Sequence, residues 1–285
     1  IPVQPLVEGY PANVGIGRPA LHQVLGDQAI AAGANVRLGV TANEIHDDGN
    51  KVTVSFSDET TGEYDLVIGA DGLYSKTRAM VMPDAAGPEF VGQSVWRYNF
   101  KRPDDLDALR AYEGPTGVGL VPLSNDVMYM YVTTPEPGNP RYEHDDLAKS
   151  LREKLANAPP GIVEYVDQIT DNDGVVYRPL EVQLIEGDWF TGNVIIIGDA
   201  AHATTPHLGQ GAGMAIEDSI VLAEELEKAE TVAEAFRSFQ TRRFERCKYI
   251  VDASLAICRS QLGEGPRVDQ GRATGEMMQA VAQPL

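Results

Sequence analysis

Residues 193–225 read NVIIIGDAAHATTPHLGQGAGMAIEDSIVLAEE, and this stretch decides the fold. The β-branched run Val194–Ile197 is typical of a fully buried strand. Gly198-Asp199-Ala200-Ala201 follows at once, so a carboxylate stands just beyond the strand end. A loop with Pro206 and three glycines then leads into a helix with apolar residues at helical spacing. The glycines admit backbone N–H groups close to a ligand, and a helix start carries partial positive charge, so this stretch favours a polar ligand.

A second segment repeats part of this pattern. An apolar strand over residues 64–69 runs into Ala70-Asp71-Gly72, so a glycine and an aspartate again end a buried strand. Ligands of open α/β sheets bind beyond the carboxyl ends of the strands. We therefore expect Asp71 and Asp199 to face the same crevice, with chance similarity as the alternative.

The composition describes a globular protein with little affinity for polyanions. Of 285 residues, 43% are hydrophobic and 23% are charged, enough for one or two closely joined domains. The net charge of −19 argues against nucleic acid and anionic membranes as partners. No apolar run approaches the ~20 residues of a membrane span. Cys247 and Cys258 fall in one expected helix, about 16 Å apart and too far for a disulfide. This fits a reducing compartment, and we expect a cytoplasmic protein.

The rest of the chain forms two α/β pieces around an antiparallel sheet. A first helix begins at Arg18-Pro19 and ends at Gly33, and its apolar face comprises Leu21, Val24, Leu25, Ala29 and Ala32. A short strand over 35–40, a hairpin around Asp48-Gly49 and a short helix with Lys76 and Arg78 follow. From about residue 87, strands are expected at 94–100, 109–113, 117–123, 127–134 and 175–182. Helices are expected at 145–156, 161–169 and 232–262, and residues 263–285 form a weaker trailing segment.

Two long motifs carry a family resemblance. Residues 69–78 read GADGLYSKTR, a complete GADGxxSxxR motif, and residues 198–211 complete GDAAHxxxPxxGQG, with Glu217-Asp218 in the helix that follows. With the antiparallel sheet between these motifs, residues 10–260 resemble the flavin-dependent aromatic hydroxylases. These are single-component monooxygenases with the p-hydroxybenzoate hydroxylase fold.

The resemblance implies a mixed α/β fold (α/β with α+β character) in four parts. A partial Rossmann-like FAD-binding domain takes residues 1–86 and, with C-terminal helices, residues 186–262. The antiparallel sheet forms an inserted substrate domain at 87–185. Residues 263–285 are a C-terminal tail.

The resemblance also implies the cofactor contacts. Asp199 accepts hydrogen bonds from the ribityl chain of FAD, although a helix N-cap is the alternative from the residues alone. The glycine loop lies along the flavin pyrimidine edge, where N–H groups and the helix dipole stabilise negative charge on the reduced flavin. Pro206 and Leu208 lie where the family closes its pocket over the flavin ring. The full implied cofactor set is Arg18, Val40, Asp71, Gly72, Arg78, Asp199, Ala200, Pro206, Gly209, Gln210, Gly211, Ala212 and Gly213.

Four of these positions have weaker or indirect roles. Asp71 lies near the FAD pyrophosphate, and a carboxylate there needs a bridging water or donor. Arg78 is the natural cation at that place, unless it is a solvated helix arginine. In the family, an arginine at the position of Arg18 contacts the flavin cofactor, and the strand ending at Val40 reaches the adenine through backbone atoms.

The substrate surface is expected on the inserted sheet. The alternation of Trp96, Tyr98, Tyr129 and Tyr131 puts two or more of these side chains on one face of the sheet. Arg97 points to the other face from Trp96 and Tyr98. The alternative is a core role, which is the more common one for aromatic strand residues. His207 and Leu208 are further candidate contacts, whereas His202 belongs to the family motif and is expected to be packed. We assign no catalytic base, and five scattered histidines without Cys-x-x-Cys predict no metal site.

One family motif has no match. The family opens with a strand and Gly-x-Gly-x-x-Gly, which holds the ADP half of FAD. Gly15-Ile16-Gly17 lacks a preceding strand and the later glycine. Because the chain also opens with Ile1, we expect that the first βαβ unit is absent from it and is carried by a second polypeptide, removed by cleavage, or outside these 285 residues.

The function implied is an FAD- and NAD(P)H-dependent monooxygenase. NADH or NADPH reduces FAD, O2 forms a flavin C4a-hydroperoxide, and a small aromatic substrate is hydroxylated. One alternative is a related flavin oxidoreductase with a non-aromatic substrate. Another is a truncated, non-catalytic binding or assembly module that needs a partner chain. The sequence leaves open the substrate, the choice of NADH or NADPH, and whether the protein is a monomer or a homodimer.

Overall fold

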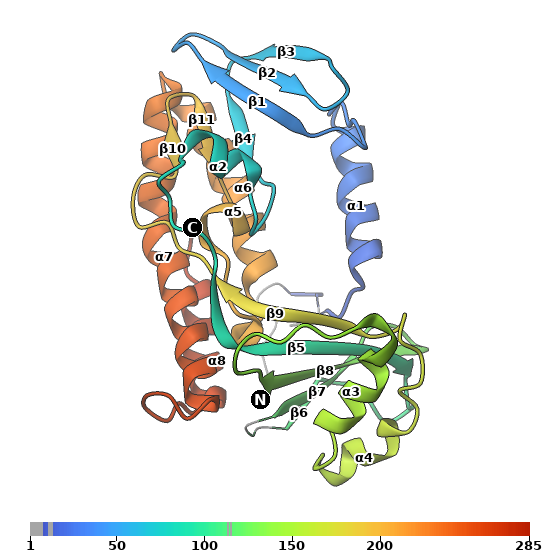
Figure 1. Ribbon diagram of the computed structural model, residues 1–285. Coiled ribbons are helices and arrows are strands. Elements are labelled where there is room, and N and C mark those ends of the chain that lie inside the picture. Colours follow the sequence, from blue (N-terminus) through green and yellow to red (C-terminus); the bar gives the residue numbers. More distant parts are fainter. Residues whose placement is uncertain (1–7, 11–13, 113, 115) are drawn as a thin grey trace. The chain divides into compact units, whose positions relative to one another are not determined.

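The computed structural model describes residues 8–10, 14–112, 114 and 116–285 (Figure 1). The chain divides into two compact units, one of residues 1–36 and 92–180 and the other of residues 37–91 and 181–285. The mixed α/β fold class is confirmed. The domain limits inferred from the sequence stay a prediction.

The second unit is built on the two strands that the aspartates follow. Strand β4 (Val67–Gly69) pairs in parallel with β11 (Val194–Ile196), with Gly69 opposite Ile196, and β10 (Phe190–Thr191) pairs antiparallel with the other edge of β11. Gly69 must be small, because a Cβ there would lie 2.6 Å from Thr77 Cγ2. Parallel neighbours end at one edge, so the expected juxtaposition of the two strand ends is confirmed.

A three-stranded meander lies in the same unit. Strands β1 (Ala42–Asp47), β2 (Val52–Phe56) and β3 (Thr61–Tyr64) pair in sequence order. The expected turn at Asp48-Gly49 is present, with Gly49 at φ +89°. The strand expected over 35–40 is wrong, because that segment finds no partner strand among the described residues and Gly39 turns it at φ +75°. Strand β3 was not predicted.

Three longer α-helices and two short ones lie among the described residues of this unit. They are α2 (Lys76–Val81), α5 (Asp199–His202), α6 (Gly211–Lys228), α7 (Val232–Gln261) and α8 (Gln270–Val281). Their core is apolar and includes Trp189, Ile196, Phe236 and Phe239. Both cysteines lie in α7 and are free, as expected for one helix.

Helix α8 corrects the trailing tail expected over 263–285. The Asp269 side chain caps the helix by accepting from the Arg272 N–H at 2.9 Å. Met277 is 1% exposed and packs with Leu208 and Ile257. Burial of one apolar side therefore stabilises a segment whose local pattern is weak.

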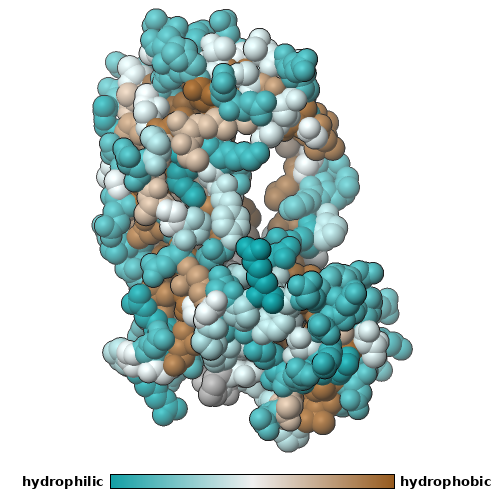
Figure 2. Space-filling model, in the orientation of Figure 1, coloured by the Kyte–Doolittle hydropathy of each residue, from teal (hydrophilic) through white to brown (hydrophobic). Residues whose placement is uncertain are grey.

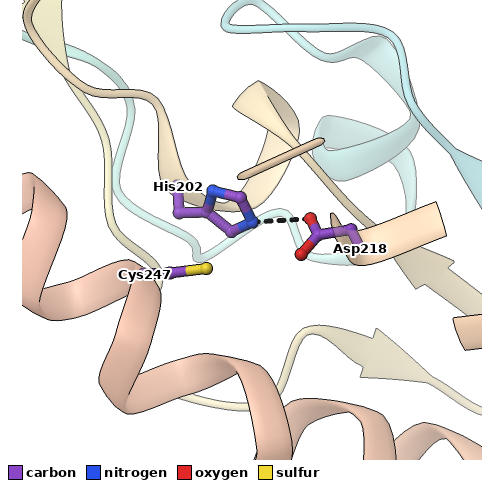
Figure 3. A group of neighbouring side chains, drawn as sticks. All are labelled: His202, Asp218 and Cys247. Atoms are coloured by element: carbon purple, nitrogen blue, oxygen red, sulfur yellow. Dashed lines mark hydrogen bonds and ion pairs between the residues drawn. The ribbon is translucent and has the colours of Figure 1, made fainter. Parts of the chain in front are cut away.

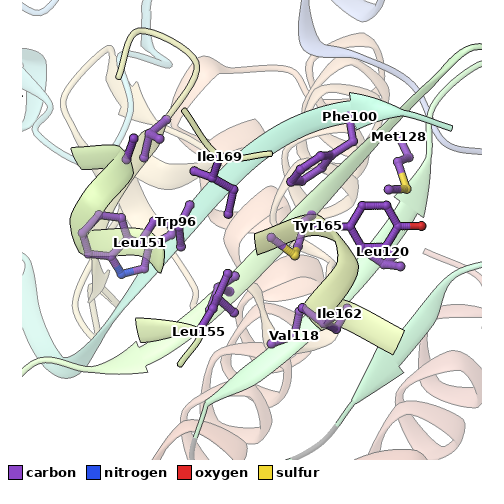
Figure 4. Close-up of a cluster of buried hydrophobic side chains, with 14 of the residues drawn as sticks. Trp96, Phe100, Val118, Leu120, Met128, Leu151, Leu155, Ile162, Tyr165 and Ile169 are labelled. Atoms are coloured by element: carbon purple, nitrogen blue, oxygen red, sulfur yellow. The ribbon is translucent and has the colours of Figure 1, made fainter. Parts of the chain in front are cut away.

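The first unit contains the expected antiparallel sheet. Its strand order is β6 (Arg110–Tyr112), β7 (Gly117–Pro122), β8 (Val127–Pro135), β5 (Glu89–Lys101) and β9 (Val176–Val182). The short helices α3 (Leu147–Lys154) and α4 (Pro160–Val166) cover one face, preceded by a 3-10 turn at His144–Asp146 (Figure 1). The core between helices and sheet includes Trp96, Met128, Leu151 and Ile162 (Figure 4).

Helix α1 (Arg18–Ala31) starts where the sequence indicates, but it has no buried residue. Val24, Leu25 and Ile30 are 56%, 49% and 57% exposed, and hydrophobic side chains lie uncovered along this helix (Figure 2). The predicted apolar face is therefore not a core face within the described residues. In the described ranges, no helix combines the length and the apolar character that crossing a bilayer requires.

Candidate functional site

The turn after β11 presents a free carboxylate. Gly198 adopts φ +60°, ψ −143°, a conformation open in practice only to glycine, and donates its N–H to the Asp218 carboxylate at 2.8 Å. Asp199 comes next as the first residue of α5, is exposed, and forms no hydrogen bond with another described residue. The N-cap alternative for Asp199 is wrong, because the cap position is Gly198 and no side chain bonds there. The carboxylate is therefore available to hydroxyl donors.

The glycine loop leads into the start of an 18-residue helix. Pro206 is exposed and begins a 3-10 turn (Pro206–Leu208), and Gly209 reverses the chain at φ +67°. The first backbone bond into α6 runs from the Met214 N–H to the Gln210 carbonyl. Among the described residues, the N–H groups of Gly211, Ala212 and Gly213 meet no backbone acceptor, and the first turn holds no acidic residue. Such a helix start stabilises carbonyl oxygens and negative charge.

Asp71 closes the turn after β4 rather than projecting from it. One oxygen accepts from Ser75 Oγ at 2.5 Å, and the other accepts from the Thr77 N–H and hydroxyl at 2.9 and 3.0 Å. Burial opposes ionisation, but these bonds outweigh it and lower the pKa of Asp71. Asp71 therefore shapes the start of α2, and Gly72 at φ +81° completes the turn.

Arg78 joins the two motifs. Its guanidinium donates to the Leu73 carbonyl at 2.8 Å and to the Ala200 carbonyl at 2.7 Å, and the residue is only 6% exposed. The alternative of a solvated helix arginine is wrong. Both hydrogen bonds hold the guanidinium against backbone carbonyls, which leaves it fewer N–H groups for the expected contact with the FAD phosphates.

Buried charged side chains form a hydrogen-bonded network with the end of β11, and Figure 3 shows His202 and Asp218 of this network. The Asp218 carboxylate has no exposed surface and accepts from Gly198 N–H, His202 Nε2 and Arg243 Nε at 2.7 to 2.8 Å. Arg243 also bonds Glu217 at 2.7 Å. Burial disfavours charge on His202, but its bonds to Asp218 and Cys247 raise its pKa to about 10. His202 is packed, as expected, whereas Arg243 has no local signal in the sequence because its partners are 25 and 26 residues away.

The same network brings together a group that sequence spacing did not reveal. Ligand atoms of His202, Asp218 and Cys247 lie within 4.8 Å of one another. Arg243 Nη2 lies 3.5 Å from Cys247 Sγ and its Nε bonds Asp218. A guanidinium thus already supplies positive charge at this place, which makes a metal cation an unfavourable addition.

The loop candidates His207 and Leu208 are held by their own unit. Leu208 is 5% exposed and packs in the cluster with Ile257 and Met277, and its assignment as a substrate contact stays a prediction. His207 shares hydrogen bonds with Thr205 Oγ1 at 3.0 Å and Gln261 Oε1 at 3.2 Å. Burial lowers the pKa of His207 to about 4, so its imidazole is neutral at pH 7.

The four aromatic candidates on the sheet divide between its two faces. Trp96 and Tyr98 stand opposite Val132 and Met130 and belong to the helix-covered core, where Trp96 has no exposed surface. This corrects their assignment as substrate contacts. Tyr129 and Tyr131 lie on the other face with Arg97, which confirms that Arg97 points away from Trp96.

The structure shows few contacts for the two remaining cofactor candidates, Arg18 and Val40. Arg18 starts α1, is exposed, and forms no ion pair with a described residue. Val40 is half-buried and ends the irregular segment 35–40, so no strand presents its backbone.

Comparison with known proteins gives one family. Residues 6–254 match the family described as the FAD binding domain. YetM of Bacillus subtilis (strain 168) is 31% identical, covering 93% of this chain and 72% of YetM. A 2-heptyl-3-hydroxy-4(1H)-quinolone synthase of Pseudomonas aeruginosa is 32% identical over 82% of this chain and 61% of that enzyme. An FAD-dependent urate hydroxylase of Mycolicibacterium vanbaalenii is 29% identical over 77% and 57%.

Solved structures share the fold. HpxO of Klebsiella pneumoniae, complexed with FAD and uric acid, gives a TM-score of 0.82 at 23% identity and covers 94% of this chain and 72% of that one. A salicylate hydroxylase substrate complex gives 0.74 at 20% identity, with 90% and 70% covered. The chain spans 57% to 72% of the length of the curated relatives named above.

Proposed function

Because the chain belongs to the FAD binding domain family, whose named relatives here include flavin-dependent hydroxylases, we propose that it is the greater part of an FAD- and NAD(P)H-dependent monooxygenase. Its substrate is a small aromatic molecule, and its second substrate is O2. Two observations in the same unit carry this proposal, the free carboxylate of Asp199 and the N–H groups at the start of α6 that meet no backbone acceptor among the described residues.

The residues present fit the flavin half of FAD. Asp199 would accept from ribityl hydroxyls, and the N–H groups of Gly211, Ala212 and Gly213 would stabilise negative charge on the pyrimidine ring. Bound FAD supplies the redox chemistry, taking electrons from NAD(P)H and delivering one oxygen atom of O2 to the substrate ring. Arg78 and Asp218 would fix the backbone that carries these groups. The two free buried thiols fit a cytoplasmic location.

In the family, a Gly-x-Gly-x-x-Gly segment binds the nucleotide half of FAD. The edge of β4 that faces away from β11 could pair with the strand of such a segment. The Val67 N–H bonds the Asn193 carbonyl and the Gly69 carbonyl accepts from Ile197, so both residues face β11. Ile68 between them turns its N–H and C=O to the other edge, where no described strand pairs, and it is 42% exposed. We propose that a parallel strand of this segment, on another polypeptide or another part of the same protein, pairs along β4.

Flavin titration tests the proposal. The chain is mixed with a Gly-x-Gly-x-x-Gly segment, titrated with FAD by fluorescence, and assayed for substrate-stimulated NAD(P)H oxidation with a panel of phenols. Asp199→Ala should weaken FAD binding about 10- to 100-fold, the value of a hydrogen bond to a charged group. Glu227→Ala removes an exposed carboxylate on α6 and serves as the matched control.

The outcomes separate the alternatives. Unchanged FAD affinity in Asp199→Ala contradicts the assigned site. FAD binding without NAD(P)H oxidation favours a non-catalytic module. Oxidation whose product carries oxygen on a non-aromatic carbon favours the other oxidoreductase class, and mass spectrometry with 18O2 distinguishes these products.

A further inference from the structure

Helix α8 lies beyond the residues that match the family, yet it contacts the turn that precedes the glycine loop. The match ends at residue 254, and α8 begins at Gln270. Gln270 Nε2 donates to the His207 carbonyl at 3.4 Å, in the middle of the 3-10 turn Pro206–Leu208. Met277 packs with Leu208 of the same turn. One polar and one apolar contact therefore join α8 to this turn.

The polar contact is part of a closed cycle of hydrogen bonds. His207 Nε2 shares a bond with Gln261 Oε1 at 3.2 Å, and Gln261 Nε2 donates to Gln270 Oε1 at 3.3 Å. Gln270 returns to His207 through the backbone carbonyl. The cycle thus joins one residue of the turn, one of α7 and one of α8.

This cycle sets the tautomer of His207. Because the amide oxygen of Gln261 can only accept, the imidazole must carry its proton on Nε2. Its Nδ1 then accepts from Thr205 Oγ1 at 3.0 Å. Burial lowers the pKa of His207 to about 4, so the ring is neutral at pH 7, as these bonds require. A neutral imidazole is therefore held on both sides, by Thr205 just before the turn and by α7.

The other end of α8 is held as well. Arg246 of α7 donates to the Ala280 and Val281 carbonyls at 3.0 and 2.7 Å, at the end where a helix leaves its carbonyl groups unsatisfied. Arg246 also bonds Glu217 of α6 at 2.9 Å. A helix held at both ends presents Gln270 to the turn in one position.

The turn in turn fixes where the glycine loop begins. The Gly209 N–H closes the turn by bonding the Pro206 carbonyl at 3.0 Å, and Gly209 reverses the chain at φ +67°. Only Gly209 and Gln210 separate the turn from α6, which starts at Gly211. A shift of the turn would therefore move the N–H groups at the start of α6.

We propose that Gln270 is a positioning residue that acts through His207, holding the turn that places the glycine loop against the flavin. The role toward the flavin rests on the proposed function, whereas the hold on the turn does not. The cofactor site thereby extends to the C-terminal helix α8, which acts on the loop without needing to touch the flavin.

The test removes the bond from α8 and follows the turn directly. Gln270→Leu has a similar size but can neither accept from Gln261 nor donate to His207. Solvent exchange of the Gly209 N–H, measured by NMR on the whole chain, should become about 2- to 10-fold faster, the value of one hydrogen bond. Gln279→Leu replaces an exposed glutamine of the same helix and should leave this exchange unchanged.

Three further measurements distinguish positioning from a general loss of stability. Exchange in the meander of residues 42–64 should be the same in Gln270→Leu as in the wild type. Imidazole 15N spectra of the wild type at pH 7 should show His207 protonated on Nε2. Gln270→Glu keeps an acceptor for Gln261 but cannot donate to the His207 carbonyl, so it should also speed exchange at Gly209, and it serves if Gln270→Leu fails to fold.

Three results overturn the inference. They are wild-type exchange at Gly209 in either folded Gln270 variant, a His207 proton on Nδ1, and equal acceleration of exchange in the meander.

FAD affinity separates this inference from the proposed function. With the Gly-x-Gly-x-x-Gly segment present, Gln270→Leu should weaken FAD binding about 2- to 10-fold, and Gln279→Leu should not. Faster exchange at Gly209 with wild-type FAD affinity overturns the role of Gln270 toward the flavin and leaves the Asp199 site in place. If the wild type and all variants fail to bind FAD, the proposed function is contradicted, and faster exchange at Gly209 still supports the hold of α8 on the turn.

Discussion

Asparagine in place of Asp218 tests the buried network under the strand end. One oxygen of this carboxylate accepts from Arg243 Nε, and the other accepts from Gly198 N–H and His202 Nε2. The asparagine side chain has the same shape, but only its oxygen can accept a hydrogen bond. Its NH2 group would face N–H donors that the second carboxylate oxygen now accepts from. It also leaves the Arg243 guanidinium, itself 1% exposed, without that negative charge.

The expected cost follows from this geometry. Breaking a buried ion pair by removing one partner costs about 3–5 kcal/mol, and Arg243 keeps Glu217 at 2.7 Å, so we expect the lower end, about 3 kcal/mol. For a protein of this size, that corresponds to a loss of roughly 6–12 °C in Tm. Thermal unfolding is followed by circular dichroism and by emission of Trp189, whose ring lies 5.0 Å from the His202 ring.

The matched control is Glu224→Gln on the same helix. Glu224 pairs with Arg242 at the surface, where its side chain is 43% exposed, so its loss should leave Tm close to that of the wild type. If Asp218→Asn unfolds at the wild-type temperature, or with the small change of the control, the network does not stabilise this unit as argued.

Two further predictions concern His207 and Gly119. Burial lowers the pKa of His207 from 6.5 to about 4, so its contribution to stability is complete above pH 6.5 and is lost as the pH falls toward 4. The unfolding free energy of the wild type should therefore fall by about 3 kcal/mol more than that of His207→Gln between pH 7 and 4, measured by urea titration at each pH. Parallel curves would contradict a buried neutral imidazole. Gly119→Ala should push the Tyr131 ring off the sheet and change the near-ultraviolet circular dichroism, whereas an unchanged spectrum would show that the ring does not depend on that space.

Sequence alone predicts the parts of the fold that have local signals. Strands β4 and β11 are short β-branched runs that end in glycine and aspartate, and their pairing follows because such ends share one sheet edge. The segment 35–40 alternates apolar residues at Val36, Leu38 and Val40, but a strand also needs a partner, and none is present among the described residues. Helix α8 shows the converse, since packing against Leu208 supplies what its sequence lacks.

The candidate site divides in the same way. The free carboxylate of Asp199 and the open helix start at Gly211 come from motifs that are continuous in sequence. Which face of the sheet is covered depends on where α3 and α4 pack, so alternation alone could not separate Trp96 from Tyr131. Arg243 was missed because its partners Asp218 and Glu217 lie 25 and 26 residues away in the sequence, on another helix, and only folding brings them together.

The uncovered edge of β4 also bears on how this protein behaves in solution. A strand edge with free N–H and C=O groups is a template for pairing with another chain, and Ile68 adds exposed apolar surface to it. The edge is only three residues long, which limits such pairing. The chain on its own should therefore self-associate weakly as its concentration rises, and a segment that occupies the edge should suppress this aggregation. Light scattering across a concentration series, with and without that segment, would measure how well the edge is protected.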